Sequence, residues 1–307
     1  MDKKYVVLQN RGVLKIEGAD RYNFLQGLIT QDIKSLTRDH AVYSAFLTPQ
    51  GRYQYDFFMI EINDAIYLDV EINRMEDLLC RFKIYKLRSQ VILSDETSAW
   101  TVILLLGDQP NNAFELEADL GKTLLYEAGI VYVDPRLKTL GLRSILPAHF
   151  DVSCLEAKGF RKAKFTEYDC LRLSLGVPDG SRDMKIDKAI PLECNLDELN
   201  AIGWKKGCYM GQELTARTKY VGLVRKRLIP VIIEGEPPLD PEDPIIFEGE
   251  KMGYLHSRCE NRGLALLRLE GLKKVILGKE RLQLGETFLI PYIPDWMEIG
   301  LNKSFDS

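Results

Sequence analysis

The 307-residue sequence contains no CxxC pair and only three histidines, His40, His149 and His256, far apart in the chain. Structural zinc sites and four-cysteine cluster sites usually place two ligands close together in sequence, so a self-contained site of that kind is disfavoured. The separated histidines also argue against a metallohydrolase or a Ser–His–Asp hydrolase. No window approaches the roughly 20 apolar residues that a membrane-spanning helix needs, so no membrane contact is expected.

The N-terminus lacks a targeting pattern, because its first 18 residues contain neither a long apolar segment nor an Arg-rich amphipathic presequence. We therefore expect a cytoplasmic protein, or a protein of another compartment seen without its presequence. The six cysteines are widely spaced. This spacing is typical of reduced thiols in a reducing compartment rather than of a disulfide framework.

A bulk excess of positive charge is also missing, since the formal net charge is -4. Binding driven by nucleic-acid phosphates usually needs a basic surface, so a nucleic-acid partner is not expected, although a local basic patch is compatible with this charge. Hydrophobic residues make up 46% of the chain and charged residues 28%. This balance is typical of a globular protein with a core, and the length favours two domains.

Strand-like segments occur as hairpins rather than in alternation with helices, which favours an α+β fold over a doubly wound parallel sheet. We predict an α+β region over residues 1–222, as one domain or two interlocked subdomains, and a small β-barrel over 223–303. From Val224 onward, short strands and Pro/Gly turns replace almost all helical periodicity. Residues 108–128 are polar and irregular, which predicts a surface excursion. Three helices are predicted from periodicity and capping residues, over residues 20–28, 73–87 and 166–176.

The stretch KKGCYMGQELTAR, residues 205–217, places Cys208 among glycines and cations. A helix starting near Met210 would put the thiol at or before the first helical turn, where cations and the helix terminus lower a thiol pKa. Gly207 and Gly211 would leave the sulfur approachable. Cys208 is then a nucleophile, a redox group or a soft-metal ligand. The other interpretation, a cysteine that only fills space at a turn, stays open.

Seven lysines and arginines but one acid lie between Lys205 and Arg227. This run is either a solvated cationic face or a docking site for an acidic group, such as a polyglutamyl tail, a phosphate or an acidic protein. Arg217 is the best candidate for planar recognition of a carboxylate. Cys80 and Cys170 fit core or partly buried positions of helices, whereas the remaining cysteines stay unassigned.

Several blocks resemble the YgfZ family of folate-binding proteins of iron–sulfur cluster assembly, in the branch that includes the mitochondrial cluster-assembly factor. The cysteine block KGCYMGQELTAR, followed by Gly222, resembles the signature of that family, and the forty residues before it agree. FLQGLITQDI and FLTPQGRYQYDFF, which begin at Phe24 and Phe46, resemble the first two blocks of the family. The resemblance covers most of residues 15–228 and is loose in the predicted barrel.

The resemblance implies a fold similar to glycine-cleavage T-protein, in which α+β subdomains and a C-terminal barrel form a ring around a folate site. It also implies that Cys208 is the signature thiol and that a bound folate, such as tetrahydrofolate, contacts neighbouring and distant side chains. Glu193, in PLECNL, matches a carboxylate placed for folate, and its other interpretation is a helix-capping or surface acid. Asp56 either touches folate or pairs with Arg52. The remaining implied cofactor contacts are Lys206, Tyr209, Gln212, Glu213 and Arg217.

Departures from T-protein argue against aminomethyl transfer, because Tyr55 replaces one of two adjacent acids and Ser174 replaces a glutamate. We therefore predict an assembly or repair factor, monomeric when alone. It binds folate and uses Cys208 to share or transfer an iron–sulfur cluster with an A-type carrier. The alternatives are a folate-dependent one-carbon transferase with Asp56 at its centre, a tRNA-modification factor, and a folate-binding module whose thiol only senses oxidation.

Overall fold

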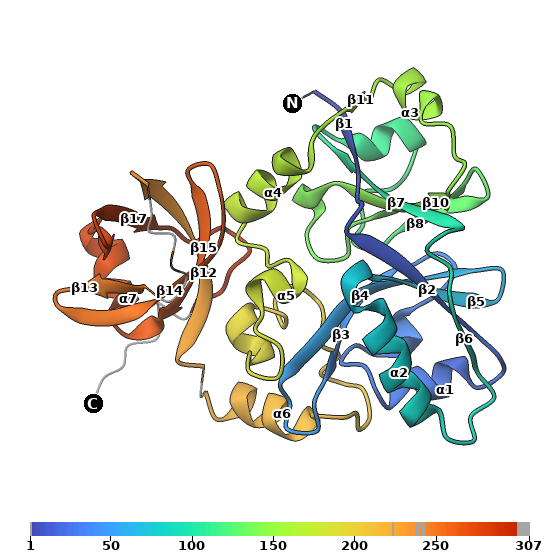
Figure 1. Ribbon diagram of the computed structural model, residues 1–307, viewed down its shortest axis with the longest axis horizontal. Helices are drawn as coiled ribbons and strands as arrows, with labels where there is room; N and C mark the ends of the chain where they lie inside the picture. Colours follow the sequence, from blue (N-terminus) through green and yellow to red (C-terminus); the bar gives the residue numbers. More distant parts are fainter. Residues whose placement is uncertain (1, 223, 237–239, 241–242, 300–307) are drawn as a thin grey trace. The chain divides into compact units, whose positions relative to one another are not determined.

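The computed structural model describes residues 2–222, 224–236, 240 and 243–299 (Figure 1). Its chain divides into two compact units, each built from two separate segments. Unit 1 comprises Met1–Tyr168 and Leu199–Gln212. Unit 2 comprises Asp169–Glu198 and Glu213–Ser307.

Unit 1 contains two β-sheets. One has five strands in the order β3-β4-β5-β2-β6, and the other has six in the order β11-β1-β7-β10-β9-β8. All neighbours are antiparallel except β1 and β11. Short turns join the pairs β3-β4, β4-β5 and β8-β9 into hairpins. The strands are β1 Lys4–Val7, β2 Arg11–Glu17, β3 Val42–Leu47, β4 Tyr53–Ile62, β5 Ala65–Glu71, β6 Ile92–Asp95, β7 Trp100–Leu106, β8 Thr123–Tyr126, β9 Gly129–Val133, β10 Leu142–Pro147 and β11 Arg161–Lys162.

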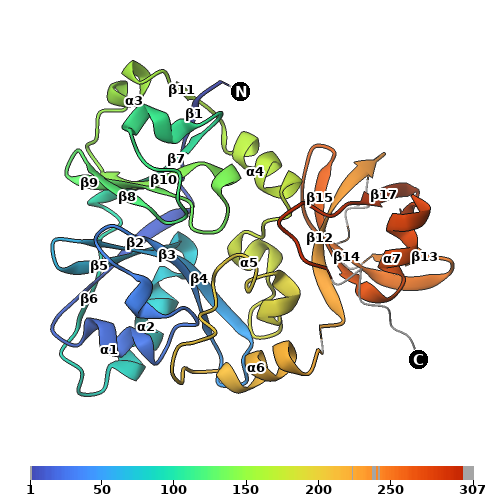
Figure 2. The ribbon, with the colours of Figure 1, turned by 180° about the vertical axis from the view of Figure 1, so that it is seen from behind.

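Helices α1 (Arg21–Gln26) and α2 (Met75–Lys86) cover the five-stranded sheet and lie beside it in both ribbon views (Figures 1 and 2). Helix α2 buries Leu78 and Phe82 in the same core as the strands. The ring of Phe82 meets that of Phe46 edge to face, with centroids 5.5 Å apart. The helix predicted over residues 73–87 is therefore confirmed, because its apolar face is the face that packs.

The segment 108–128 is only partly the predicted surface excursion. Phe114 and Leu116 are buried in the core of the six-stranded sheet, together with Leu155 from α3 (Ser153–Ala157). The end of the segment forms β8 at the edge of that sheet. Phe114 and Leu116 are only two residues apart and are each followed by a glutamate, so no helical or longer strand periodicity revealed their burial.

A buried group of charges joins the two sheets of unit 1. The carboxylate of Asp69, on β5, accepts hydrogen bonds from Arg11 on β2 and from Arg143 on β10. All three residues are nearly inaccessible to solvent. Charged side chains are buried only when they are paired, and here the pairing crosses from one sheet to the other.

Unit 2 is built around a closed barrel with the strand order β12-β15-β14-β13-β16-β17. This confirms the predicted α+β fold with a C-terminal barrel; residues 223 and 300–303 of the predicted barrel lie outside the described residues. The strands are β12 Lys226–Glu234, β13 Pro244–Phe247, β14 Glu250–Cys259, β15 Arg262–Arg268, β16 Leu282–Leu284 and β17 Thr287–Pro291. The helices are α5 Gly180–Asp183, α6 Gln212–Tyr220 and α7 Leu269–Gly278, with α4 Phe165–Ser174 spanning the boundary of the units.

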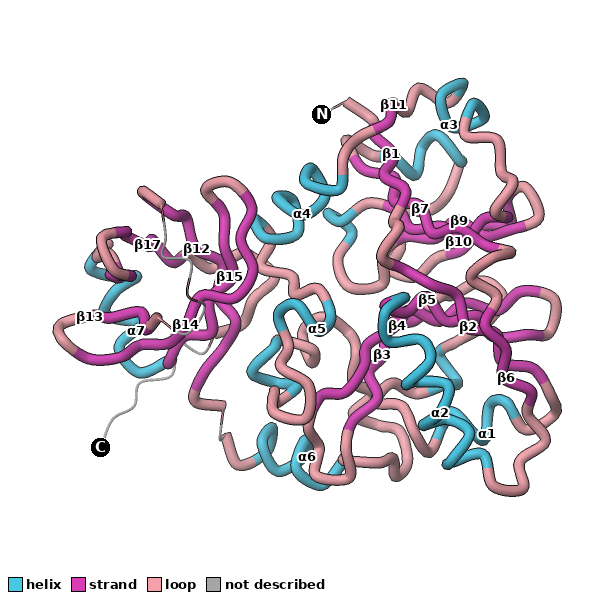
Figure 3. Tube along the Cα trace, in the orientation of Figure 1, coloured by secondary structure: helices cyan, strands magenta, loops and turns pink. Residues whose placement is uncertain are grey.

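Helix α7 contradicts the expectation that the barrel region has almost no helix (Figure 3). It buries Leu272 and Val275 in the barrel core and exposes the side chains around them. Glu270 and Gly271 interrupt the helical backbone near its start. Only about two helical turns remain after this interruption, which is too short for the periodicity to stand out among neighbouring strands.

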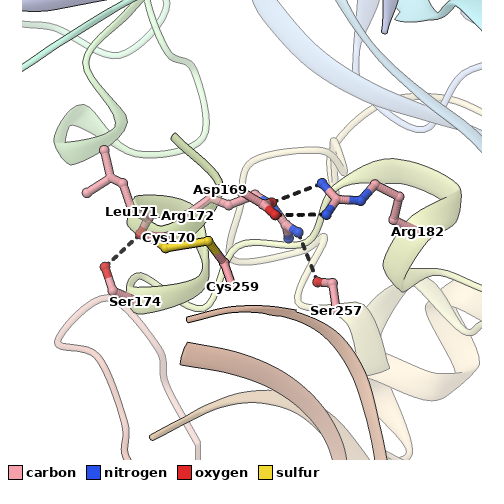
Figure 4. Close-up of a disulfide and its surroundings, with 8 residues drawn as sticks. All are labelled: Asp169, Cys170, Leu171, Arg172, Ser174, Arg182, Ser257 and Cys259. Atoms are coloured by element: carbon pink, nitrogen blue, oxygen red, sulfur yellow. Dashed lines mark hydrogen bonds and ion pairs between the residues drawn. A yellow bond between two sulfur atoms is a disulfide. The ribbon is translucent and has the colours of Figure 1, made fainter. Parts of the chain in front are cut away.

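Two of the six cysteines form a disulfide, which corrects the prediction that all of them are reduced. Cys170 on α4 is bonded to Cys259 at the end of β14, and the two cysteines are 89 positions apart in the sequence. Figure 4 shows the bond beside the ion pair of Asp169 and Arg182. Spacing in sequence gave no sign of the pairing, because it is the fold of unit 2 that brings this helix to the end of this strand.

Replacing both Cys170 and Cys259 with serine is expected to lower the free energy of unfolding of unit 2 by about 2–4 kcal/mol, since the cross-link restricts the unfolded chain. The fold should persist, because Tyr292 and Trp296 also donate hydrogen bonds to the C-terminal end of α4 and the residue after it. Urea unfolding with and without reductant measures the effect.

The matched control is the serine variant of Cys154, a free and half-buried cysteine in unit 1. If reductant lowers the free energy of unfolding of the wild type no more than that of the double variant, the Cys170–Cys259 disulfide does not stabilise the protein.

Candidate functional site

Cys208 is an exposed, free thiol in a loop of unit 1 that leads into α6. The helix begins at Gln212, two residues later than predicted, so the thiol lies before the first helical turn. Gly207 beside it is also exposed, whereas Lys206 and Tyr209 on either side are buried. The chain therefore presents two residues to solvent between two fixed points.

The first fixed point is Lys206. Its Nζ donates to the carbonyl oxygens of Gln26 at 2.9 Å, Ile29 at 2.5 Å and Gln31 at 2.9 Å. These carbonyls lie at the C-terminal end of α1 and just beyond it, where a cation is favourable. Burial lowers the pKa of Lys206 to about 8, so the ammonium with its three donors is still the main form at neutral pH. All three N–H groups are used inside unit 1, which makes Lys206 an anchor of the loop.

The second fixed point is formed by Met210 and Gly211, two and three residues after the thiol. The backbone N–H of Met210 donates to the carbonyl of Gly27 at 3.0 Å. Gly211 has φ +82°, and a Cβ there would lie 2.6 Å from the carbonyl oxygen of Thr48. Only glycine fits so close to the turn between β3 and β4. The signature glycine thus holds the loop against the β-hairpin that carries the second resembling block.

Replacing Lys206 with methionine, an unbranched side chain of similar reach, should lower the free energy of unfolding by about 1–3 kcal/mol, because three carbonyls lose their donor. In the wild type this free energy should also rise with pH between about 8 and 10.5. The folded protein releases the Lys206 proton first, while the unfolded chain still binds it. Urea unfolding across this pH range measures both effects.

The exposed neighbour Lys205 provides the control. Lys205→Met should leave both the free energy of unfolding and its pH dependence nearly unchanged. Equal unfolding curves for Lys205→Met and Lys206→Met would contradict the role of Lys206 as an anchor of the loop.

The basic run divides into structural and exposed members. In unit 2, Arg227 is buried and pairs with Glu198 at 2.8 Å, and Lys219 reaches Asp197 at 3.4 Å. Arg217 is exposed in the last turn of α6. Only part of the run is therefore available to another molecule.

Asp56 lies on β4 and is 5% exposed. Its carboxylate accepts hydrogen bonds from the hydroxyls of Tyr43 at 2.9 Å and Tyr53 at 2.6 Å. Burial and the charge of Asp56 raise the pKa of both tyrosines well above the ordinary value. No motif in the sequence points to these tyrosines; the signal that could have found them is the position of the three residues on two strands joined by one short turn.

Glu193 lies in the 3-10 turn Pro191–Cys194 of unit 2 and is half-buried. The candidate residues are thus distributed over both units: Asp56, Lys206, Cys208, Tyr209 and Gln212 in unit 1, and Glu193, Glu213 and Arg217 in unit 2. Lys206 and Tyr209 are in contact, with Nζ 4.9 Å from the ring centroid. Gln212 is half-buried and its N–H donates to the carbonyl of Tyr209, whereas Glu213 is exposed in the first turn of α6.

Within the described residues, no group of three or more His, Cys, Asp or Glu side chains is arranged to hold a metal ion. None of the helices in the same residues is long and apolar enough to span a bilayer.

Comparisons with known proteins give a consistent result. A family model of the CAF17 C-terminal beta-barrel domain matches residues 225–299. The mitochondrial iron–sulfur cluster assembly factor IBA57 of Mus musculus is 30% identical, over 94% of this chain and 84% of its own. The mitochondrial IBA57 homologue of Neosartorya fischeri is 29% identical, over 90% of this chain and 72% of its own.

Among solved structures, glycine cleavage system aminomethyltransferase T from Bartonella henselae matches with a TM-score of 0.75 at 12% identity, covering 96% of this chain and 86% of that chain. This similarity concerns the fold and confirms the predicted T-protein-like architecture. The predicted cytoplasmic location, in contrast, is wrong, because the relatives are mitochondrial proteins. That prediction depended on the composition of the first residues alone.

Proposed function

Because the chain belongs to the IBA57 family of iron–sulfur cluster assembly factors, we propose that it acts in assembly by offering the Cys208 thiol to a cluster. The observation that carries this proposal is the exposed thiol between two buried anchors. Thiolates are the preferred protein ligands of iron–sulfur clusters. A thiol held in place but open to solvent suits a ligand that is shared with another protein.

A cluster normally takes four protein ligands, and Cys208 supplies one. A partner must therefore contribute the others, and we propose an A-type carrier for this role. The cluster is then the cargo that passes between the two proteins, rather than a resident group of this chain. The narrower assignment to the YgfZ branch also belongs to the proposal, and is supported by the signature around Cys208.

We further propose that the protein binds a folate such as tetrahydrofolate. Glu193 is the carboxylate proposed to contact the pterin, and its half-buried position on a short turn supports this role. Asp56 fits the role less well, since it is only 5% exposed. Bound folate would supply a one-carbon carrier, and no step of the cluster proposal depends on it.

The test is anaerobic cluster reconstitution of the full chain mixed with an A-type carrier, read by visible absorption. A cluster-bound complex that forms with the wild type and not with Cys208→Ala supports the proposal. Equal spectra for the two proteins would remove the thiol from cluster binding. Attention would then pass to folate-dependent transfer, with Asp56→Asn and Glu193→Gln as the variants to assay.

A further inference from the structure

We propose that a hollow of unit 1, beside α1, binds a free cationic amino acid. The buried carboxylate of Glu61 receives the cationic side chain of the ligand, and Lys34 at the rim receives its carboxylate. This site is separate from the proposed cluster chemistry, and neither proposal depends on the other.

The hollow measures about 540 Å³, a size typical of sites for small ligands. Its walls come from α1, from the segment 33–39 that begins with the 3-10 turn Ile33–Ser35, and from the end of β4. All of these segments belong to unit 1, so the site is complete within one unit. The polar lining residues are Tyr22, Gln26, Lys34, Arg38, Asp39 and Glu61.

Glu61 interrupts the apolar pattern of β4. Side chains alternate between the two faces of a strand, so Glu61 shares the face of Tyr55, Phe57 and Met59, which pack in the core. Glu61 itself is only 7% exposed. A buried carboxylate is unfavourable unless it is paired, and an apolar side chain at this place would avoid that cost. A charge at such a position therefore indicates a cationic partner for it.

Within the described residues, the partners of the Glu61 carboxylate leave part of its capacity unused. Its Oε1 lies 3.6 Å from Nη2 of Arg21, which is beyond hydrogen-bond distance. The Arg21 guanidinium also donates to the carbonyl of Gly18 at 3.2 Å. Tyr22 is the other neighbour, since burial and the Glu61 carboxylate raise the pKa of its hydroxyl. An ionised carboxylate accepts about four hydrogen bonds, so Glu61 can also receive N–H groups from a ligand.

The rim of the hollow carries both signs of charge. Lys34, Arg38 and Asp39 are all exposed there. Arg38 pairs with the exposed Asp64, so Lys34 is the better partner for a carboxylate of the ligand. Asp39 and Glu61 disfavour a ligand that is only anionic. The charges therefore fit a ligand that carries a cation at one end and a carboxylate at the other.

A cationic amino acid also matches the apolar part of the lining. Its hydrocarbon stem can pack against Tyr22 and Leu36 while both charged ends are paired. The hollow adjoins the signature loop, because the carbonyl of Gln26, a lining residue, accepts a hydrogen bond from Lys206 at 2.9 Å. A bound ligand thus contacts the helix on which that loop is anchored.

Isothermal titration calorimetry of the full chain with L-arginine and, separately, with L-lysine tests the site. We expect saturable binding of one ligand per chain. L-citrulline has the shape of arginine with an uncharged head group, so it should bind at least about tenfold more weakly. Agmatine keeps the guanidinium and lacks the carboxylate, as an arginine inside a protein chain does. It should bind about two- to fivefold more weakly, because the lost ion pair is exposed.

Three variants test the lining. Glu61→Gln keeps the shape of the side chain and should raise the Kd for L-arginine about tenfold or more. Lys34→Met should raise it about two- to fivefold. Asn23 is exposed on α1 and lines the hollow, so Asn23→Trp should fill the space and prevent binding without altering Glu61. The matched controls Glu76→Gln and Lys83→Met change exposed charges on α2 and should bind as the wild type does.

Several results would overturn the inference. They are a wild type that binds neither amino acid saturably, L-citrulline that binds as tightly as L-arginine, and Asn23→Trp that binds L-arginine normally. Ligand-induced protection from hydrogen exchange outside α1 and residues 33–39 would place the ligand elsewhere. Circular dichroism shows which variants fold, and the comparison of ligands on the wild type decides the case even if Glu61→Gln does not. None of these results affects the Cys208→Ala experiment, so the two proposals fail independently.

Discussion

Replacing Cys208 with alanine is expected to abolish cluster formation in the mixture with the carrier while leaving the protein as stable as the wild type. The functional loss should be complete, because Cys208 is the cysteine that the signature loop presents to solvent and an alanine offers no ligand in its place. Stability should change by no more than about 0.5 kcal/mol, as for most exposed side chains. The thiol is exposed, so its removal leaves no cavity.

Cys80 provides the matched control. It is also a free, exposed cysteine of unit 1, on the outer side of α2 and outside the signature loop. Cys80→Ala should form the cluster-bound complex as the wild type does. Loss of the complex in both variants would indicate a general thiol effect rather than a ligand at residue 208. A Cys208→Ala variant that unfolds more easily would give the residue a structural role instead.

Sequence patterns predicted correctly the helices and strands in which the apolar face, marked by the spacing of apolar residues, is the face that packs in the core. The apolar spacing of Leu78 and Phe82 marked α2, and turn residues marked most hairpins of unit 1. The same reasoning identified the C-terminal barrel, since a dense series of short strands and turns has few other solutions. The exposed position of Cys208 was also predicted, from the glycines around it.

Other features could not be predicted because they depend on residues far away in the chain. Lys206 was expected to contact folate or to belong to a cationic face, whereas the carbonyl groups that hold it lie at least 175 residues earlier. The bond between Cys170 and Cys259 spans 89 residues and has no local signal. For Lys206 and for the disulfide, the missing information was a contact between distant segments. The partners of Asp56, Tyr43 and Tyr53, lie only 13 and 3 residues away, and the missing information there was the register of β3 against β4.

Asp69→Asn is the substitution expected to destabilise unit 1 most. The carboxylate is fully buried and bonds Arg11 and Arg143, and Arg143 also lies 3.8 Å from the ring centroid of Phe58. An asparagine keeps the shape but leaves two buried guanidinium groups without their negative partner. Removing one member of a buried ion pair costs about 3–5 kcal/mol, because the remaining charge has lost both water and its partner.

The exposed pair of Arg38 and Asp64, in the same unit, provides the comparison. Its side chains are 68% and 73% exposed, so water already screens both charges. Asp64→Asn should therefore leave the unfolding curve nearly unchanged. Urea unfolding reports both variants, and hydrogen exchange in β5 and β10 locates the loss at the junction of the sheets. If Asp69→Asn and Asp64→Asn lowered the free energy of unfolding equally, burial would not make the Asp69 ion pairs more important for stability than an exposed pair.

The dependence on pH separates the lost charge from a simple change of shape. Burial alone would raise the pKa of Asp69, but the charges of Arg11 and Arg143 outweigh it and hold the pKa below the ordinary value of 3.8. A carboxylate with a lowered pKa stabilises the fold above its unfolded pKa, and this contribution disappears as the pH falls through the folded value. The stability gap between wild type and Asp69→Asn should thus be constant above about pH 4 and narrow below it. A gap that stays constant under acid would assign the loss to packing, because protonation of Asp69 would then change nothing.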